Sequence, residues 1–252
     1  MKRLLIACVA LAGCVNQTAP TGGGATTPDR AQASAKVHTE LAALYYENAQ
    51  YAIALEEIET AMKAVRRYAP ALTMRALVHM ALREDKEAES DFQLSLKFDP
   101  SSSETHNNYG WFLCQRGREK ESLAEFTEAL KNPLYATPEK ALVNAAICSR
   151  KSGNDAAAED YYRRTLIVRP GALDAHLGLA ELSLDHGDAI GAKSHYLQYE
   201  KMANELPSAA NLWLAVRIER RLGNAAGAES YGAQLRKRYP EARETQLMLY
   251  GQ

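Results

Sequence analysis

The chain has 252 residues, of which 46% are hydrophobic and 24% are charged, and its formal net charge is −1. This composition excludes a wholly disordered chain and a protein with many membrane spans, and it gives no sign of a nucleic-acid-binding surface. Only 9 Pro and 15 Gly interrupt several alanine-rich stretches, so we expect a mainly helical fold.

The first residues are typical of a bacterial export signal. Residues 1–3 are positively charged after the initial Met, and residues 4–12 form an apolar run too short for a membrane-spanning helix. The run ends in Leu-Ala-Gly-Cys, which resembles the lipobox of bacterial lipoproteins. The resemblance implies that residues 1–13 are a cleaved lipoprotein signal peptide and that Cys14 carries acyl chains such as palmitate. The resemblance also favours the outer membrane, because Val15 rather than Asp follows Cys14. The alternative is a signal peptide with a chance cysteine.

Residues 14–34 are expected to hold the lipidated cysteine and a flexible tether. They are rich in Thr, Ala, Gly and Pro and poor in large apolar side chains. The three glycines at 22–24 are not a phosphate-binding loop, because no Gly-Lys-Ser/Thr follows them. We therefore place no function in this segment beyond attachment.

Residues 35–242 repeat with a period of roughly 34 residues. Small residues recur once per period, at Ala42, Ala76, Gly110, Ala146 and Ala180. A second small set follows at Ala54, Ala88, Ser122, Ala158 and Ala192, and prolines close units at Pro100, Pro170 and Pro240. Small residues allow two antiparallel helices to cross closely, and a proline ends the second helix.

This pattern resembles the tetratricopeptide repeat (TPR). The resemblance implies an all-α fold, a right-handed superhelix (α-solenoid) of helix-turn-helix pairs, with the first helices lining a concave face. We assign six units, approximately at 35–68, 69–102, 103–138, 139–172, 173–208 and 209–242. Residues 243–252 remain as a C-terminal tail.

No catalytic or metal-binding motif is recognisable. The chain lacks Gly-x-Ser-x-Gly, His-Glu-x-x-His and Cys-x-x-Cys, and its six His residues are scattered. His38, His106 and His176 share one repeat position and are interpreted as partly buried packing residues rather than ligands. We expect no enzyme activity, no metal, no cofactor and no small-molecule substrate.

Two cysteines of the repeats fall on successive first helices, which pack side by side in a TPR stack. Cys114 belongs to the third unit and Cys148 to the fourth. An oxidising periplasm would allow a disulfide if the Cα atoms lie within roughly 7 Å. The sequence leaves two readings open, a Cys114–Cys148 bridge or two buried thiols.

A solenoid of this kind offers an extended surface for a protein partner. The predicted groove residues are Leu77, Met80, Asn107, Trp111, Val143, Ile147, Arg150, Leu177 and Trp213. Their apolar members suit a helix or strand of a partner, or they pack against neighbouring units. The basic pairs and runs near the C-terminus, 220–221 and 236–238, are a solvated helix face or a contact for an acidic partner.

Three stretches resemble one family more closely. They are residues 107–113 (NNYGWFL), 132–135 (NPLY) and 231–240 (YGAQLRKRYP). They are similar to the type IV pilus biogenesis and stability lipoproteins of the PilF/PilW family, and the cysteine pair resembles the Neisseria-type branch.

The resemblance implies a pilotin-like protein without nucleic-acid partners. It would sit in the outer membrane by its lipid, face the periplasm, and help the pilus secretin to localise and form multimers. Pilus assembly or stability, twitching motility, adhesion and DNA uptake would depend on it. The alternative is another envelope TPR scaffold lipoprotein, serving outer-membrane protein assembly or cell-wall enzymes.

Overall fold

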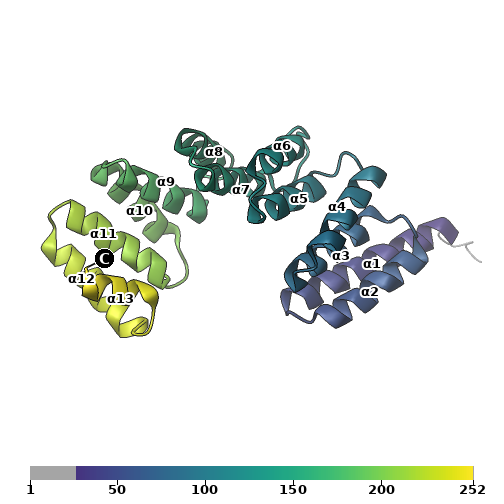
Figure 1. The fold of residues 1–252 in the computed structure, drawn as a ribbon, viewed down its shortest axis with the longest axis horizontal. Coiled ribbons are helices and arrows are strands. Elements are labelled where there is room, and N and C mark those ends of the chain that lie inside the picture. Colours follow the sequence, from purple (N-terminus) through teal and green to yellow (C-terminus); the bar gives the residue numbers. More distant parts are fainter. Residues whose placement is uncertain (1–26, 252) are drawn as a thin grey trace, which may run out of the picture.

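The computed structural model describes residues 27–251, and these form thirteen α-helices without a strand. The predicted signal peptide, the predicted lipidation at Cys14 and most of the predicted tether lie outside the described residues. The helices form a solenoid of antiparallel pairs bent into an arch (Figure 1).

Twelve helices form six consecutive pairs, and one short helix follows them. The first three pairs are α1 (Thr27–Glu47) with α2 (Tyr51–Ala64), α3 (Ala69–Leu82) with α4 (Asp85–Phe98), and α5 (Ser103–Gln115) with α6 (Glu119–Ala129). The next three are α7 (Pro138–Lys151) with α8 (Asp155–Val168), α9 (Leu173–Asp185) with α10 (Ala189–Met202), and α11 (Ala209–Arg221) with α12 (Ala225–Arg238). Helix α13 (Arg243–Tyr250) closes the described chain.

The small residues of the repeat lie where the two helices of each pair cross. Ala42, Ala76, Ala146 and Ala180 are fully buried. At the same place in the third pair, a Cβ added to Gly110 would lie 2.8 Å from a ring carbon of Phe126. The close approach of the two backbones therefore explains the small residues.

The turn inside each pair contains a left-handed residue, and in the last three pairs a capping side chain follows it. Gly153 (φ 77) and Gly187 (φ 85) take this conformation without a Cβ penalty. The next residue, Asn154 or Asp188, then accepts a hydrogen bond from the backbone N–H of residue 157 or 191. In the first pair the left-handed residue is Ala49 (φ 55).

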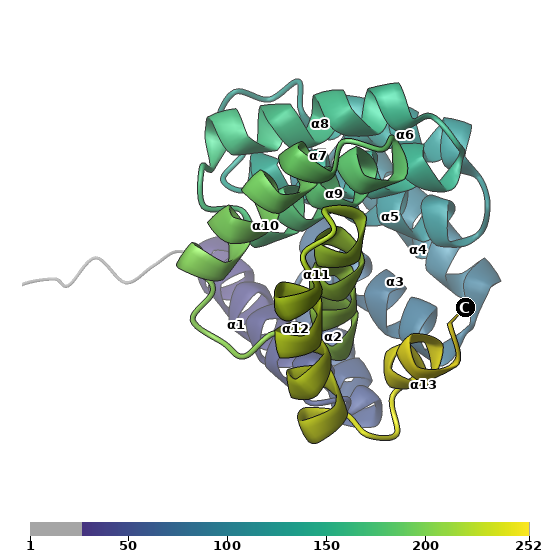
Figure 2. The same cartoon turned by 90° about the vertical axis from the view of Figure 1, so that its left-hand side faces the viewer.

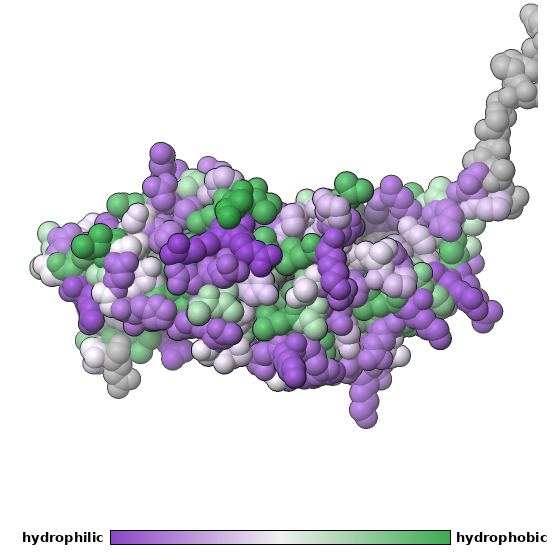
Figure 3. All heavy atoms as spheres, turned by 90° about the horizontal axis from the view of Figure 1, so that it is seen from above, coloured by the Kyte–Doolittle hydropathy of each residue, from purple (hydrophilic) through white to green (hydrophobic). Residues whose placement is uncertain are grey.

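The bend of the arch follows from which helices touch. The backbone of each first helix closely approaches that of the first helix in the next pair. Second helices of the described chain show no such backbone approach and meet only through side chains, as Tyr231 of α12 and Glu200 of α10 do. Elements on the inner side of a curve lie closer together, so α1, α3, α5, α7, α9 and α11 line the concave face. Seen from above the arch, hydrophilic side chains cover much of the convex side and apolar ones form separate groups (Figure 3).

The structure differs from the sequence interpretation at both ends. Helix α1 begins at Thr27, inside the segment expected to be a flexible tether, and Ala35 is already fully buried. Alanines favour the helix here, and Pro28 falls in its first turn, where a missing N–H costs little.

At the other end, residues assigned to a tail form α13, which lies against α11 and α12 (Figure 2). Met248 of α13 is buried with Leu212, Val216 and Leu235. No helix among residues 27–251 is long and apolar enough to cross a membrane.

Candidate binding surface

Three hollows lie on first helices, along the concave face. The N-terminal hollow is formed by α1, α3 and α5, the central hollow by α5, α7 and α9 with the chain before α9, and the C-terminal hollow by α9, α11 and the residue after α13. Their volumes are about 430, 540 and 610 Å³ respectively. Together they give the arch a segmented inner surface rather than a single deep cavity.

The N-terminal hollow has an apolar floor and an acidic rim. Ala43, Tyr46 and Leu77 are among its apolar residues. Its charged residues are Glu40, Glu47 and Glu104, and no Lys or Arg lines it. The hollow is suited to an apolar side chain next to a positive charge.

Buried hydroxyl groups fix the helices beneath this hollow. The Thr73 hydroxyl lies 2.8 Å from those of Ser95 and Thr105, which come from α4 and α5. Ser95 also donates to the carbonyl of Ala69, at 2.9 Å. Because all three hydroxyls are buried and hydrogen-bonded, they fix α3, α4 and α5 relative to one another.

The central hollow is polar and of mixed charge. The amide of Asn144 donates to the Asn107 side-chain oxygen at 3.0 Å, linking α5 to α7. Arg169 pairs with Glu139 at 3.3 Å on the rim. Asn107 is buried, so its main contacts are within the protein.

The C-terminal hollow is cationic. It is lined by Trp213, Arg217, Arg220 and Arg221, against a single acidic residue, Asp185. The guanidinium of Arg220 lies over the Trp213 ring, 5.4 Å from its centroid.

Four of the nine predicted groove residues line these hollows: Leu77, Asn107, Val143 and Trp213. The other five, Met80, Trp111, Ile147, Arg150 and Leu177, line none of the three. Trp111 packs against the cluster around Cys114 and Cys148, and Leu177 against the cluster between α9 and α11. Trp111 and Leu177 are therefore partly buried between neighbouring units.

Arg150 is used in a contact between pairs. It donates to Glu181 and, at 2.6 Å, to Asp185, both on α9. Burial disfavours its charged form, but the two carboxylates outweigh burial and raise the pKa of Arg150. Its charge is therefore compensated within the protein.

Several lining residues escaped the sequence interpretation. Glu40 on α1 and both Glu104 and Asn108 on α5 line the N-terminal hollow. Asn108 follows the predicted groove residue Asn107, and Glu104 lies one turn before Asn108. A helix side chain leans toward the N-terminus, so the hollow is lined by a stripe slightly rotated from the expected one. The repeat spacing identifies the helix face but not this rotation.

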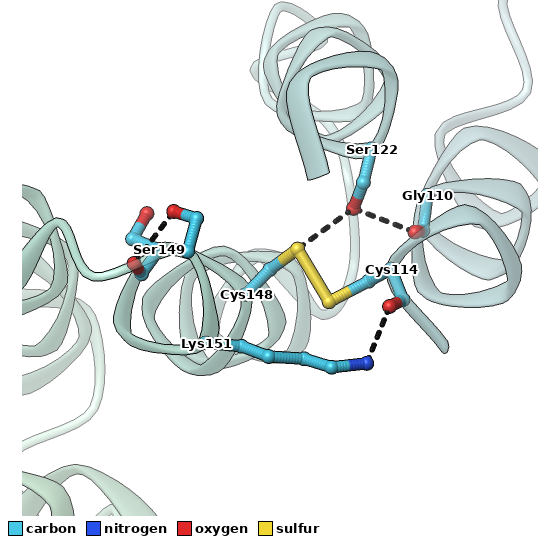
Figure 4. The surroundings of a disulfide bond; sticks show 7 residues. Gly110, Cys114, Ser122, Cys148, Ser149 and Lys151 are labelled. Carbon is cyan, nitrogen blue, oxygen red and sulfur yellow. Dashed lines mark hydrogen bonds between the residues drawn. A yellow bond between two sulfur atoms is a disulfide. The ribbon is translucent and has the colours of Figure 1, made fainter. Parts of the chain in front are cut away.

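A disulfide joins α5 to α7 (Figure 4). The Cα atoms of Cys114 and Cys148 lie 5.8 Å apart, and both residues are fully buried. Ser122 Oγ lies 3.3 Å from Cys148 Sγ and donates to the Gly110 carbonyl at 2.7 Å. Lys151 Nζ donates to the Cys114 carbonyl at 2.8 Å. The bridge and its polar neighbours join the third pair to the fourth.

The three histidines that share a repeat position contact partners inside their own pairs. The Nδ1 contacts are His38 with Glu57 at 2.6 Å, His106 with Glu125 at 2.6 Å, and His176 with His195 at 3.5 Å. No group of three or more His, Cys, Asp or Glu suited to a metal ion occurs among the described residues.

Comparisons with known proteins place this fold among pilus biogenesis factors. The crystal structure of PilW, a widely conserved type IV pilus biogenesis factor, is 36% identical with a TM-score of 0.78, over 85% of this chain and 98% of that one. A structure of PilF from Pseudomonas aeruginosa gives a TM-score of 0.80 at 23% identity, over 90% of this chain and all of that one.

Curated sequences agree with the structures. The type IV pilus assembly protein PilF of Pseudomonas aeruginosa is 26% identical over 171 residues, which are 68% of this chain and 67% of PilF. No protein-family profile matches the sequence. The identity to PilW over nearly its whole length is decisive, and the chain belongs to the PilF/PilW family of type IV pilus biogenesis proteins.

Proposed function

We propose that this chain is a lipid-anchored adaptor of the outer membrane that binds the type IV pilus secretin and assists its localisation and multimerisation. The observation that carries the proposal is the 36% identity to the pilus biogenesis factor PilW, over 98% of that chain. The concave face with its three hollows supports it, because an extended preformed surface suits a segment of a protein partner.

The mechanism is tethering. Acyl chains on Cys14 would hold the solenoid at the periplasmic side of the membrane, since each buried CH₂ contributes about 0.8 kcal/mol. A secretin subunit held on the concave face would meet other subunits at a raised local concentration. Such a role needs binding and positioning but no bond chemistry.

A pull-down with the secretin tests the binding surface. Leu77→Asp places a charge on the apolar floor of the N-terminal hollow and should reduce capture at least tenfold, about 1.4 kcal/mol or more. The matched control is Leu134→Asp, since Leu134 lies between α6 and α7 and is 87% exposed. Circular dichroism establishes that both variants fold; equal capture by both would contradict the assignment.

A separate experiment tests the anchor. A Cys14→Ala protein should leave the outer membrane fraction, and the secretin should form fewer multimers there. Membrane fractionation and a gel assay of secretin multimers measure both effects. Normal localisation and normal multimers with this variant would show that the anchoring part of the proposal is wrong.

A further inference from the structure

The two ends of the concave face differ in charge. The charged lining of the N-terminal hollow is entirely acidic, whereas the C-terminal hollow has three arginines and one aspartate. The arginines and Trp213 follow one another on α11 at helical spacing, so they project from the same face. This contrast distinguishes the C-terminal hollow from a generally charged surface.

Two of the three arginines lack an ionic partner within residues 27–251. Arg217 pairs with Asp185 at 3.1 Å, and Asp185 also accepts from Arg150 at 2.6 Å. Arg220 and Arg221 are exposed and make no ion pair in this part of the chain. Within the described residues, the charges of Arg220 and Arg221 are therefore not compensated by an ion pair.

Trp213 adds an apolar contact to these charges. Its ring is partly buried and packs against the cluster of Leu212, Val216, Leu235 and Met248. Arg220 lies over this ring and contacts the Met248 carbonyl at 3.5 Å, which holds its guanidinium near the hollow. Arg220 and Arg221 lie in the last turn of α11, where the helix dipole favours any basic residue. The dipole does not explain why Trp213 lies beside them.

We propose that the C-terminal hollow binds an acidic segment of a protein partner, with Asp or Glu side chains at Arg220 and Arg221 and an apolar side chain against Trp213. Planar guanidinium groups suit carboxylates because they donate two parallel hydrogen bonds. The hollow is formed by residues of the first helices α9 and α11, on the concave side of the arch that Figure 1 shows. A concave surface fits an extended segment better than it fits a flat bilayer. The inference deepens the proposed function and rests on it for the partner's identity, but not for the binding chemistry.

Tryptophan fluorescence gives a readout specific to this hollow. The chain has two tryptophans, so Trp111→Phe leaves Trp213 as the only one. The probe is a short peptide of glutamate and leucine, acetylated and amidated so that its only carboxylates are on side chains. It should change the Trp213 emission with a saturable dependence on concentration, and added NaCl should weaken the binding.

The test variant is Arg220→Gln/Arg221→Gln in the Trp111→Phe background. We expect the Kd for the acidic peptide to rise about tenfold or more, and its dependence on NaCl to become shallower. The matched control is Lys237→Gln/Arg238→Gln, which removes the same charge from exposed positions on α12 of the same pair. This control should bind the peptide within about twofold of the parent, and thermal unfolding establishes that both variants fold.

Three outcomes would overturn the inference. They are equal binding of a peptide with glutamine in place of glutamate, an equal loss of affinity in the α12 control, and a response of Trp213 to phosphatidylglycerol vesicles but not to the peptide. A secretin pull-down separates the two proposals. If wild type captures no secretin but binds the peptide through Arg220 and Arg221, the proposed function fails and the inference stands. If wild type captures the secretin but no peptide binds, the inference alone fails.

Discussion

At the scale of single residues, packing between successive pairs leaves little space. Gly178 of α9 is buried against Tyr162 of α8, and an added Cβ would overlap Cζ of that ring and lie 2.7 Å from Cε1. The contact shows that the fold needs the absence of a side chain at this position. A helical glycine normally costs about 1 kcal/mol relative to alanine, so this packing need outweighs helix propensity.

Gly178→Ala should lower the free energy of unfolding by about 1–3 kcal/mol, because the added methyl group overpacks the contact with Tyr162. Urea denaturation followed by circular dichroism measures the change. Gly171→Ala is the control, since its Cβ would lie 3.5 Å from Met202 Sδ, an ordinary contact, and the effect should stay within about 0.5 kcal/mol. If both variants are as stable as the wild type, the junction between the fourth and fifth pairs is less tightly packed than the structure shows.

His195 should make the protein sensitive to acid. Burial lowers the pKa of His195 below 6.5, and the charges of His176 and Arg163 lower it further, against Asp188 and Glu159. Between the lowered pKa and 6.5 the unfolded chain binds more protons, so the free energy of unfolding falls as the pH drops through this range. In the His195→Gln variant the free energy of unfolding should fall less over this pH range than in the wild type, as measured by urea denaturation.

His106 provides a contrast of opposite sign. Burial disfavours its charged form, but hydrogen bonds to Glu125 and the Pro100 carbonyl and the charges of Glu125 and Glu128 raise its pKa above 6.5. Its stabilising contribution is complete below 6.5 and is lost as the pH rises through the raised pKa. His106→Gln should therefore be most destabilised at acidic pH; the same pH dependence in both histidine variants would refute these assignments.

At the scale of elements, the repeat spacing predicts helix pairs well because close crossings demand small residues and turns demand glycine or a cap. It fails where a helix forms without the repeat signature. The start of α1 is rich in alanine and threonine, a composition shared by flexible linkers, and only contact with the rest of the first pair buries Ala35. Helix α13 forms because it covers α11 and α12 at the end of the stack, where Met248 joins the buried side chains of Leu212, Val216 and Leu235. Neither fact is visible in a local window of sequence.

The disulfide between α5 and α7 should stabilise the fold by joining the third pair to the fourth. Replacing both cysteines, Cys114→Ala/Cys148→Ala, should lower the free energy of unfolding by about 3–4 kcal/mol, the chain-entropy value for a closed loop of this length. A reducing agent should destabilise the wild type by a similar amount and leave the double variant unchanged, as measured by urea denaturation with and without dithiothreitol. A titration that finds two free sulfhydryls in the denatured, unreduced protein would exclude the bridge.

At the scale of the whole molecule, the sequence predicts a concave face but not the hollows on it. The hollows depend on the angle between successive pairs, which small differences in packing set at each junction. The contrast between an acidic N-terminal hollow and a cationic C-terminal hollow also arises from side chains on several helices. Arg150 illustrates the limit: its position suits a groove residue, but Glu181 and Asp185 of the next pair engage it.

The solenoid should lose stability locally rather than as a whole, because each pair contacts only its neighbours. Met248→Ala removes a buried side chain of α13 and should cost about 2–4 kcal/mol at the C-terminal end. Hydrogen exchange measured by mass spectrometry should then accelerate in α11 and α12 and stay unchanged in α1–α4. Leu249→Ala is the control, since Leu249 on the same helix is 54% exposed and should have little effect. Equal acceleration from α1 to α12 in the Met248 variant would mean that the six pairs unfold as one cooperative unit.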